Sequence, residues 1–408
     1  MNRETEEFIR ENADGDVRLL ALQKAKQTAV DMPFALCQIA GRQAARRKLP
    51  TFAAAEGIIY PPHLSLEQCS SEQTARYKAA IAQRLGINGT LTDLTGGFGV
   101  DFFFLAQGMK RAVYVEQQAH LCDAAETNFK LLGLTNANVK NADSIEILHQ
   151  MEPVSLVFLD PARRDGNGAR TYSMADCTPN VPEMLDELLR KAEYVMLKLS
   201  PMLDWHKAVE DLKAVTEVHI VSVANECKEL LLVLSAEHPS PMRLFCVNDG
   251  SVFECPLHPK NSEEWAKMEA KQTTFSLPEA GGYLYEPNSS IMKAGCFDAL
   301  SDHFGIHPVG NNSHLFASRE FIASFPGRKF QISSISSMNK RDLRELLKGL
   351  KQANITVRNF PLSVAELRKR LRLRDGGNVY LFATTDMNGR HILIKTTPPD
   401  APSEEKNT

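Results

Sequence analysis

The chain has 408 residues, of which 43% are hydrophobic and 24% charged, and its formal net charge at pH 7 is -3. This composition is typical of a globular protein that is long enough for two or three hydrophobic cores, and so small a net charge does not single out any class of partner. A membrane-spanning protein is not expected, because no apolar run approaches the ~20 residues that a transmembrane helix needs.

The cysteines and the first residues indicate where the protein works. The eight cysteines are spread along the chain and form no Cys-x-x-Cys pair, so we expect reduced thiols and neither disulfides nor a metal site. The stretch MNRETEEFIRENADGD is polar and acidic, unlike a signal peptide. We therefore expect a cytoplasmic protein.

Residues 1–88 are expected to form an N-terminal helical region. Apolar residues recur there at spacings of three and four, which is the period of an amphipathic helix. Ser70 or Ser71 is a suitable N-cap for a helix that ends near Leu85.

From residue 89 to about 260, short apolar segments alternate with amphipathic ones. Strands are predicted at 90–94, 112–116, 138–142, 155–160 and 194–200, with helices at 99–108, 119–133, 144–150 and 180–192. Fully apolar strands that alternate with helices are typical of a parallel sheet covered on both faces, so the fold class is α/β. Residues 217–223 and 228–235 suit a hairpin, so one late strand should run antiparallel. Asp249-Gly250 predicts the turn of a further hairpin.

The composition changes again after about residue 261. Residues 287–318 are expected to form one helix followed by a loop and a strand. From 327 to 397 the predicted order is βαβαββ, that of a small α+β unit such as a ferredoxin-like or KH-like module. The polar tail, 398–408, should be disordered.

The stretch LTDLTGGFGVDFFFLAQG, residues 91–108, places three glycines between the first strand and a helix. It is not a dinucleotide fingerprint, because Phe102 takes the place of the third small residue of G-x-G-x-x-G/A. A P-loop is excluded because no Gly-Lys-Ser/Thr follows.

An acidic residue lies at the end of each of the first four predicted strands: Asp93, Glu116, Asp143 and Asp160. An open α/β sheet binds its ligand at this edge. Carboxylates at every strand end favour a cationic ligand with many hydrogen-bond donors and no phosphate, and S-adenosylmethionine fits that description. Glu116 would accept both ribose hydroxyls, and the glycines would let the backbone approach the methionine moiety.

These motifs resemble those of the class I S-adenosylmethionine-dependent methyltransferases over residues 75–260. DLTGGFGVD is similar to the first motif of that family, VYVEQ to the second, NADS to the third and LDPAR to the fourth. The resemblance implies a Rossmann-like sheet and the following cofactor-binding residues: Asp93, Thr95, Gly96, Gly97, Gly99, Asp101, Glu116, Gln117, Asp143 and Ser144. The alternative is a Rossmann-like domain that kept the fold and lost the ligand.

The fourth motif implies the catalytic residues Asp160, Pro161 and Arg163. Methyltransferases that act on nucleobase amines have Asp/Asn-Pro-Pro-aromatic here, and this chain has Ala162 and Arg163 in the last two positions. That departure puts an exocyclic amine target in doubt without excluding it.

Four further residues are candidate substrate contacts: Arg164, Tyr172, Lys198 and Ser200. Arginines bind phosphate or stack on bases, and Tyr172 could supply the missing stacking ring. For each residue a structural role remains the alternative, namely an ion pair for Arg163, Arg164 and Lys198 or loop packing for Tyr172.

The segment from Gly327 to Gly376 contains thirteen basic and four acidic residues, a local balance of +9 in a chain whose net charge is -3. Such polarisation predicts an anionic partner, with Arg368, Arg370 and Arg372 as contacts, and a merely solvated helix face is the alternative.

EQCSSEQTARYK, DLTGGFGVD, LDPARRD, YEPNSSIMKAG and GNVYLFAT together resemble a bacterial methyltransferase group, best known from the Bacteroides lineage. The resemblance implies a ferredoxin-like insert at 261–326, a THUMP-like domain at 327–397 and tRNA or rRNA as substrate. Two alternatives stay open: a methyltransferase that acts on a protein or small molecule, and a nonenzymatic RNA-binding protein on a methyltransferase scaffold.

Overall fold

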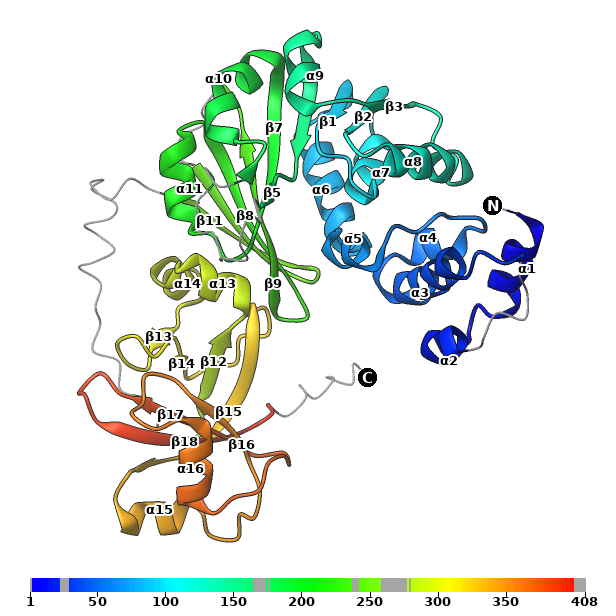
Figure 1. Ribbon diagram of the computed structural model, residues 1–408. Coiled ribbons are helices and arrows are strands. Elements are labelled where there is room, and N and C mark those ends of the chain that lie inside the picture. Colours follow the sequence, from blue (N-terminus) through cyan, green and yellow to red (C-terminus); the bar gives the residue numbers. More distant parts are fainter. Residues whose placement is uncertain are drawn as a thin grey trace, which may run out of the picture. The chain divides into compact units, whose positions relative to one another are not determined.

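The computed structural model describes residues 2–22, 29–163, 174, 177–236, 242–257, 277–278 and 280–399. The chain divides into two compact units (Figure 1). The first unit comprises Met1–Val218 and Glu229–Ser240, and the second comprises His219–Lys228 and Pro241–Thr408. The β-hairpin of β8 (Val215–Val223) and β9 (Glu226–Leu234) therefore passes from the first unit into the second.

The first unit begins with helices. They are α1 (Arg3–Glu11), α2 (Val17–Leu22), α3 (Met32–Lys48), α4 (Pro50–Ala54), α5 (His63–Gln68) and α6 (Glu72–Arg84). Ser71 is the N-cap of α6, where its side chain accepts a hydrogen bond from the Thr74 N–H at 3.2 Å. The capping prediction is confirmed, and the N-cap is Ser71 and not Ser70.

The central sheet of the first unit is mostly parallel. Its strands are β1 (Thr90–Asp93), β2 (Arg111–Glu116), β3 (Ala137–Asn141), β4 (Val154–Leu159) and β7 (Ala192–Leu199), and they continue into β9 and β8 in the order β8-β9-β7-β4-β1-β2-β3. β1 pairs in parallel with β2 and β4, and β9 runs antiparallel to β7. The predicted α/β fold and its late antiparallel strand are confirmed.

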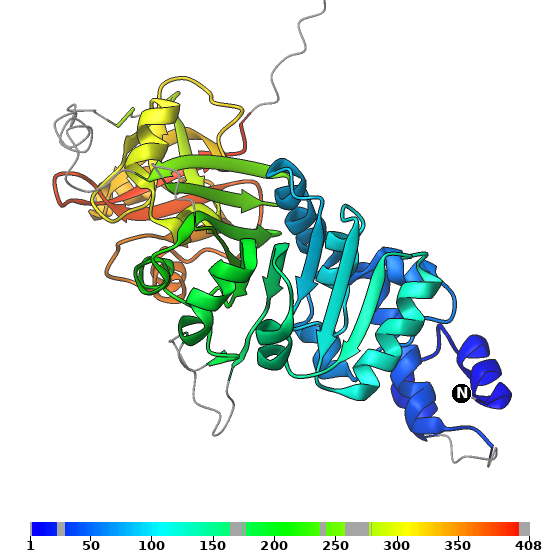
Figure 2. The ribbon, with the colours of Figure 1, turned by 90° about the horizontal axis from the view of Figure 1, so that it is seen from above.

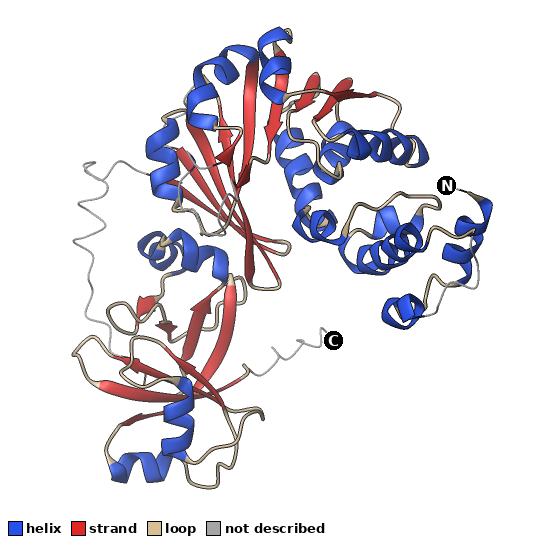
Figure 3. Ribbon diagram, viewed as in Figure 1, coloured by secondary structure: helices blue, strands red, loops and turns tan. Residues whose placement is uncertain are grey.

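Helices follow the strands in the expected alternation. They are α7 (Val100–Ala106), α8 (Ala119–Leu131), α9 (Ser144–Gln150), α10 (Val181–Lys191) and α11 (Trp205–Leu212). Figures 1 and 3 show α10 and α11 on one side of the sheet and α6 and α7 on the other. Because both faces are covered, the middle strands are apolar throughout, and Leu156–Leu159 of β4 are all buried. A short pair, β5 (Ala162–Arg163) and β6 (Cys177–Thr178), follows β4.

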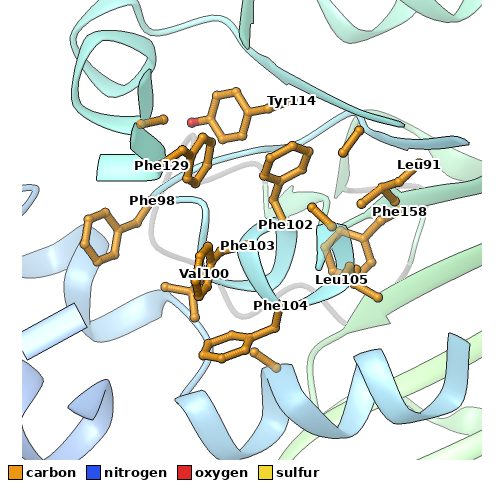
Figure 4. Packing of buried hydrophobic residues seen from close by; sticks show 14 of the residues in the cluster. Leu91, Phe98, Val100, Phe102, Phe103, Phe104, Leu105, Tyr114, Phe129 and Phe158 are labelled. Atoms are coloured by element: carbon orange, nitrogen blue, oxygen red, sulfur yellow. The ribbon is translucent and has the colours of Figure 1, made fainter. Parts of the chain in front are cut away.

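The core of the first unit is rich in aromatic rings. Every residue of α7 is buried, and its Phe102 ring lies 5.5 Å from Tyr114 and 5.0 Å from Phe129, between ring centroids. Figure 4 shows these three rings grouped beside the helix. The glycine loop therefore leads into a helix whose position is set by packing on all sides.

The second unit contains a hairpin and a second sheet. The hairpin joins β10 (Met242–Asn248) to β11 (Ser251–Leu257) through Asp249-Gly250, as predicted. The sheet has the order β13-β14-β12-β15-β18-β17-β16. Its strands are β12 (Tyr283–Pro287), β13 (His307–Pro308), β14 (Phe316–Ser318), β15 (Gly327–Ser337), β16 (Asn354–Val357), β17 (Tyr380–Thr385) and β18 (His391–Thr397).

The helices in the described part of this unit are α13 (Ser289–Ala294), α14 (Phe297–Phe304), α15 (Lys340–Leu346) and α16 (Val364–Leu371). The βαβαββ order predicted for 327–397 is confirmed. The single helix expected within 287–318 is wrong, because Gly295 adopts a left-handed φ of 71° and ends α13 before α14 begins. Figure 2 shows the two units from above. Along the ranges given above, no helix is both long enough and apolar enough to cross a membrane.

Candidate functional site

The glycine loop between β1 and α7 lies against β2. A Cβ on Gly96 would come 2.2 Å from the Tyr114 ring, and one on Gly99 would come 2.7 Å from the Phe129 ring. Gly99 also has a φ of 83° and is the N-cap of α7. The Gly97 N–H donates to Glu116 Oε2 at 3.0 Å. A side chain at Gly96 would push the loop off β2, and one at Gly99 would collide with α8, so close approach requires these two glycines.

Asp93 ends β1 and is the most deeply buried acid of this edge, with 1% of its surface exposed. Its carboxylate accepts hydrogen bonds from the Thr95 N–H at 2.9 Å and the Thr95 hydroxyl at 3.4 Å. Burial raises the pKa of Asp93, and the nearby carboxylates of Asp101 and Asp160 raise it further. A buried carboxylate among other acids is stabilised by a bound cation.

Glu116 and Asp143 lie at the ends of the neighbouring strands. Besides Gly97, Glu116 accepts the Gln118 N–H at 2.9 Å. Asp143 caps α9 by accepting the Ile145 N–H at 2.8 Å, and the Gln117 amide donates to its second oxygen. Each oxygen of both carboxylates therefore has a partner in the protein, and the bond from Gly97 lets Glu116 orient the glycine loop. The adjacent Ser144 is buried at the start of α9.

Asp160 and Lys198 form an ion pair at the ends of two adjacent strands. Leu159 of β4 is opposite Leu197 of β7 in a parallel ladder, so the next residues are neighbours. The Lys198 ammonium donates to Asp160 Oδ2, and the Asp160 N–H donates to Thr95 Oγ1 at 2.6 Å. Thr95 thus joins the first and fourth motifs.

Asp101 belongs to a buried charge cluster that the sequence did not predict. Lys78 Nζ lies 3.0 Å from Asp101 Oδ1 and 2.7 Å from Glu229 Oε1, and Ser70 donates to Asp101 Oδ2 at 2.6 Å. The Lys78 side chain is fully buried. Burial opposes ionisation of Asp101, but the ammonium groups of Lys78 and Lys198 and the hydrogen bonds from Ser70 and Lys78 together outweigh it and lower the pKa of that carboxyl. Asp101, predicted as a cofactor ligand, is therefore held by a lysine in the structure.

One signal could have revealed Lys78. It lies on the buried stripe of α6 with Thr74, Ala75, Ile81 and Ala82, so its charge falls at a core position of the helical period. A lysine at such a position requires buried carboxylates nearby. The partner Glu229 is 151 residues away in sequence and had no comparable signal.

Some predicted residues cannot be placed. Arg164, Tyr172 and the side chain of Arg163 lie outside the described residues. Pro161 is buried directly after Asp160. Ser200 is half-buried after β7, and its hydroxyl accepts the Met202 N–H at 3.3 Å.

The basic segment of the second unit divides into two groups. Glu286, which is buried, accepts hydrogen bonds from Arg328 at 2.6 Å and Arg358 at 2.8 Å. Arg368 donates to Asp375 at 2.6 Å and to the Ala353 carbonyl at 3.1 Å. These arginines pair within the unit, and the contact of Arg368 with an anionic partner stays a prediction.

Lys329 on β15 is half-buried and donates to the Phe325 carbonyl at 2.9 Å. The other basic side chains of the segment are exposed on α15, α16 and the segments after them. Within the described ranges, nine have neither a side-chain hydrogen bond nor an ion pair: Lys340, Arg341, Arg344, Lys348, Lys351, Lys369, Arg370, Arg372 and Arg374. The Arg374 N–H donates to the Lys351 carbonyl at 3.0 Å, so the two segments meet.

Comparison with known families identifies two domains in the second unit. Residues 327–398 match a family model described as THUMP domain-like, and residues 283–326 match one described as a ferredoxin-like domain. No curated protein matches the chain.

One solved structure is similar to this chain over 97% of its length, and two others are similar to less than half of it. A protein from Porphyromonas gingivalis W83, described as a "putative methyltransferase", is 29% identical with a TM-score of 0.81 over 97% of this chain and 98% of that chain. A "putative RNA methyltransferase" from Pyrococcus horikoshii is 15% identical, TM-score 0.34, over 47% of this chain and 97% of that one. A "putative methyltransferase" from Streptococcus mutans in complex with SAH is 14% identical, TM-score 0.30, over 40% and 95%. The first similarity and the two family matches confirm the resemblance drawn from the motifs.

Proposed function

We propose that this protein is an S-adenosylmethionine-dependent methyltransferase that modifies a base in RNA. The observation that carries the proposal is the arrangement of carboxylates around the glycine loop. Asp93, Glu116 and Asp160 end three strands that are adjacent in the sheet, in the order β4-β1-β2. They surround a loop whose backbone must pass close to neighbouring rings.

The donor set at this edge fits S-adenosylmethionine. Asp93 is a buried carboxylate in an acidic environment, which favours a cationic ligand over a phosphate. Glu116 would accept the ribose hydroxyls, and Gly97, where a Cβ would meet no side chain, would leave room for the methionine moiety. The bound cofactor supplies the methyl group. The contribution of the chain is to orient the substrate and exclude water around Asp160.

RNA as the substrate is supported by the second unit. Nine exposed basic side chains on and after α15 and α16 lack a protein partner within the described ranges, so they are available to phosphates. They lie in the segment that matches the THUMP domain-like model.

The alternatives explain the residues less well. A nonenzymatic scaffold has no use for a buried Asp93 or for an Asp160–Lys198 pair that is open to solvent at Asp160, whose side chain is 37% exposed. A protein or small-molecule substrate leaves the nine unpartnered cations without a role. Both alternatives are outcomes of the experiments below.

Calorimetric titration with S-adenosylmethionine tests the cofactor. We expect binding by the wild-type chain and a loss of about 10-fold or more in affinity in Glu116→Gln, because hydrogen bonds to a charged acceptor contribute about 1.5–3 kcal/mol. Glu126→Gln is the matched control, since Glu126 on α8 is exposed and forms an ion pair with Lys130 on the same helix. Absence of binding by the wild type would contradict the proposal.

A further inference from the structure

We propose that the methyl acceptor is the lactam N–H of an RNA base, such as guanine N1 or uracil N3, rather than an exocyclic amine. In this proposal Asp160 takes the N–H proton and Lys198 binds the adjacent carbonyl oxygen. The inference rests on the proposed function, since it assumes methyl transfer to RNA, and it names the substrate class of the same site.

The Asp160–Lys198 pair offers both an acceptor and a donor at the expected position of transfer. The two residues end adjacent parallel strands. An ammonium has three N–H donors, and in the part of the chain that the structure describes Lys198 uses one of them, on Asp160 Oδ2. The Asp160 side chain is 37% exposed and that of Lys198 is 12% exposed, so solvent or a substrate can reach the pair from the Asp160 side. A base edge with a neighbouring N–H and C=O matches this pair.

Lys198 is a fixed positive charge. Three carboxylates face it from three elements, namely Asp160 after β4, Asp101 on α7 and Glu229 on β9. The latter two also hold the second cation of the cluster, Lys78 on α6. Burial alone would lower the pKa of Lys198, but the three carboxylates outweigh burial and raise it. The ammonium therefore stays charged throughout the physiological range.

A fixed cation at this position discriminates between acceptors. A neutral exocyclic amine becomes a cation as its nitrogen takes the methyl group, and an adjacent ammonium repels that charge. Adenine N1 is disfavoured for the same reason. A lactam nitrogen instead loses its proton, so its charge moves toward the carbonyl oxygen, where an ammonium stabilises it.

The reaction balances with the groups present and the methyl donor. The N–H proton passes to the Asp160 carboxylate, and the freed electron pair of the nitrogen bonds to the methyl carbon. The carbon–sulfur bond of the sulfonium breaks with its electron pair remaining on sulfur. The product base is neutral, and Asp160 releases its proton to water.

The fourth motif agrees with this assignment. Sites for nucleobase amines use a second proline and an aromatic ring after the acid, whereas this chain has Asp160-Pro161-Ala162-Arg163. A site that methylates an exocyclic amine needs no such lysine, because hydrogen-bond acceptors of the protein are enough to orient a neutral amine. A lactam N–H as the methyl acceptor, in place of an exocyclic amine, thus explains both the altered fourth motif and the presence of Lys198.

The test is the identity of the methylated nucleoside. RNA from cells that lack this protein is incubated with the full-length chain and labelled S-adenosylmethionine, digested, and separated by chromatography with mass detection. We expect 1-methylguanosine or 3-methyluridine. N6-methyladenosine, N4-methylcytidine or N2-methylguanosine would overturn the lactam assignment and leave the proposed function standing. Absence of label in RNA would overturn the proposed function, and the assignment with it.

A variant pair tests Lys198 itself. Lys198→Met should lower the single-turnover rate about 100-fold, the typical effect of losing one donor to a developing oxyanion, while cofactor affinity by calorimetry changes less than about 2-fold. Lys198→Arg keeps a cationic donor and should therefore recover most of the activity that Lys198→Met loses. Lys207→Met is the control, because Lys207 is exposed on α11 and pairs with Asp211. An unchanged rate in Lys198→Met would overturn the assignment.

Discussion

The Phe98 ring of the glycine loop lies 5.5 Å from the Phe52 ring, centroid to centroid, at an interplanar angle of 51°. Phe52 belongs to α4 of the N-terminal helices, and Tyr60, whose ring lies 6.1 Å from that of Phe98, is in the segment between α4 and α5. Tyr60 is fixed in turn by Gln38, whose amide bonds to both its N–H and its carbonyl, at 2.8 and 3.0 Å. The N-terminal helices therefore support the loop directly.

Removal of the Phe52 ring should affect both stability and the loop. Phe52 is fully buried, so Phe52→Ala should lower the free energy of unfolding by about 3–5 kcal/mol. We also expect weaker binding of S-adenosylmethionine, because Phe98 loses its anchor. Leu64→Ala, at a side chain 64% exposed, is the control for denaturant unfolding and calorimetry. Unchanged cofactor affinity in folded Phe52→Ala would show that the loop does not depend on these helices.

Lys78→Met should be strongly destabilising. It removes the ammonium that pairs directly with the buried carboxylates of Asp101 and Glu229, while the charge of Lys198 still acts on both. Loss of one partner of a buried ion pair costs about 3–5 kcal/mol. The Lys78/Asp101/Glu229→Met/Asn/Gln triple variant removes all three charges and should recover more than half of the loss. Urea unfolding at pH 7 measures both, and equal stability of the single and triple variants would contradict the account.

The Lys78–Asp101 pair also predicts a pH dependence. The pKa of Asp101 is lowered in the folded state, so the pair stabilises the fold above the unfolded pKa of about 3.9. That contribution is lost as the pH falls through the folded pKa. The stability difference between wild type and Lys78→Met should therefore shrink below about pH 4, and a constant difference would contradict the ion pair.

Asp93→Asn should raise the stability of the fold and weaken the binding of S-adenosylmethionine. Because burial raises the pKa of Asp93, the wild type loses stability as the pH rises from about 3.9 through the folded pKa. Asparagine removes this loss and can still accept the Thr95 N–H, so we expect a gain of about 1 kcal/mol at pH 7. Affinity for S-adenosylmethionine should fall at least about 10-fold. Asp123→Asn, at an exposed position on α8, should change neither quantity.

The basic segment contains its own matched comparison. Arg370→Gln/Arg372→Gln should leave the melting temperature unchanged and lower the salt slope of RNA binding by about 0.7–0.9 per lost phosphate contact. Arg368→Gln should instead lower stability by about 1 kcal/mol, because it removes hydrogen bonds to Asp375 and Ala353. If Arg368→Gln changed the salt slope and Arg370→Gln/Arg372→Gln did not, the assignment of RNA contacts to Arg370 and Arg372 would be contradicted.

The sequence was most informative where a signal is local. The strands that carry Asp93, Glu116 and Asp160 were predicted because buried parallel strands are apolar along their whole length. The Asp249-Gly250 hairpin and the βαβαββ unit follow from turn residues and helical periods, which are also local.

Contacts between distant segments were not predictable in the same way. Glu229 pairs with Lys78 across 151 residues, and nothing in its neighbourhood distinguishes it from a surface glutamate. Arg368 and Arg370 are two residues apart in one basic run, yet the helical turn directs the first to Asp375 and leaves the second exposed. Such differences depend on tertiary packing, which a single sequence does not specify by its periodicity.

The central claim is tested most directly by transfer of labelled methyl groups from S-adenosylmethionine to total RNA from cells that lack this protein, with Asp160→Ala as the inactive control. We expect label that ribonuclease releases and that Asp160→Ala fails to incorporate. Tight cofactor binding with label only in protein or small molecules, or with none transferred, would contradict an RNA methyltransferase.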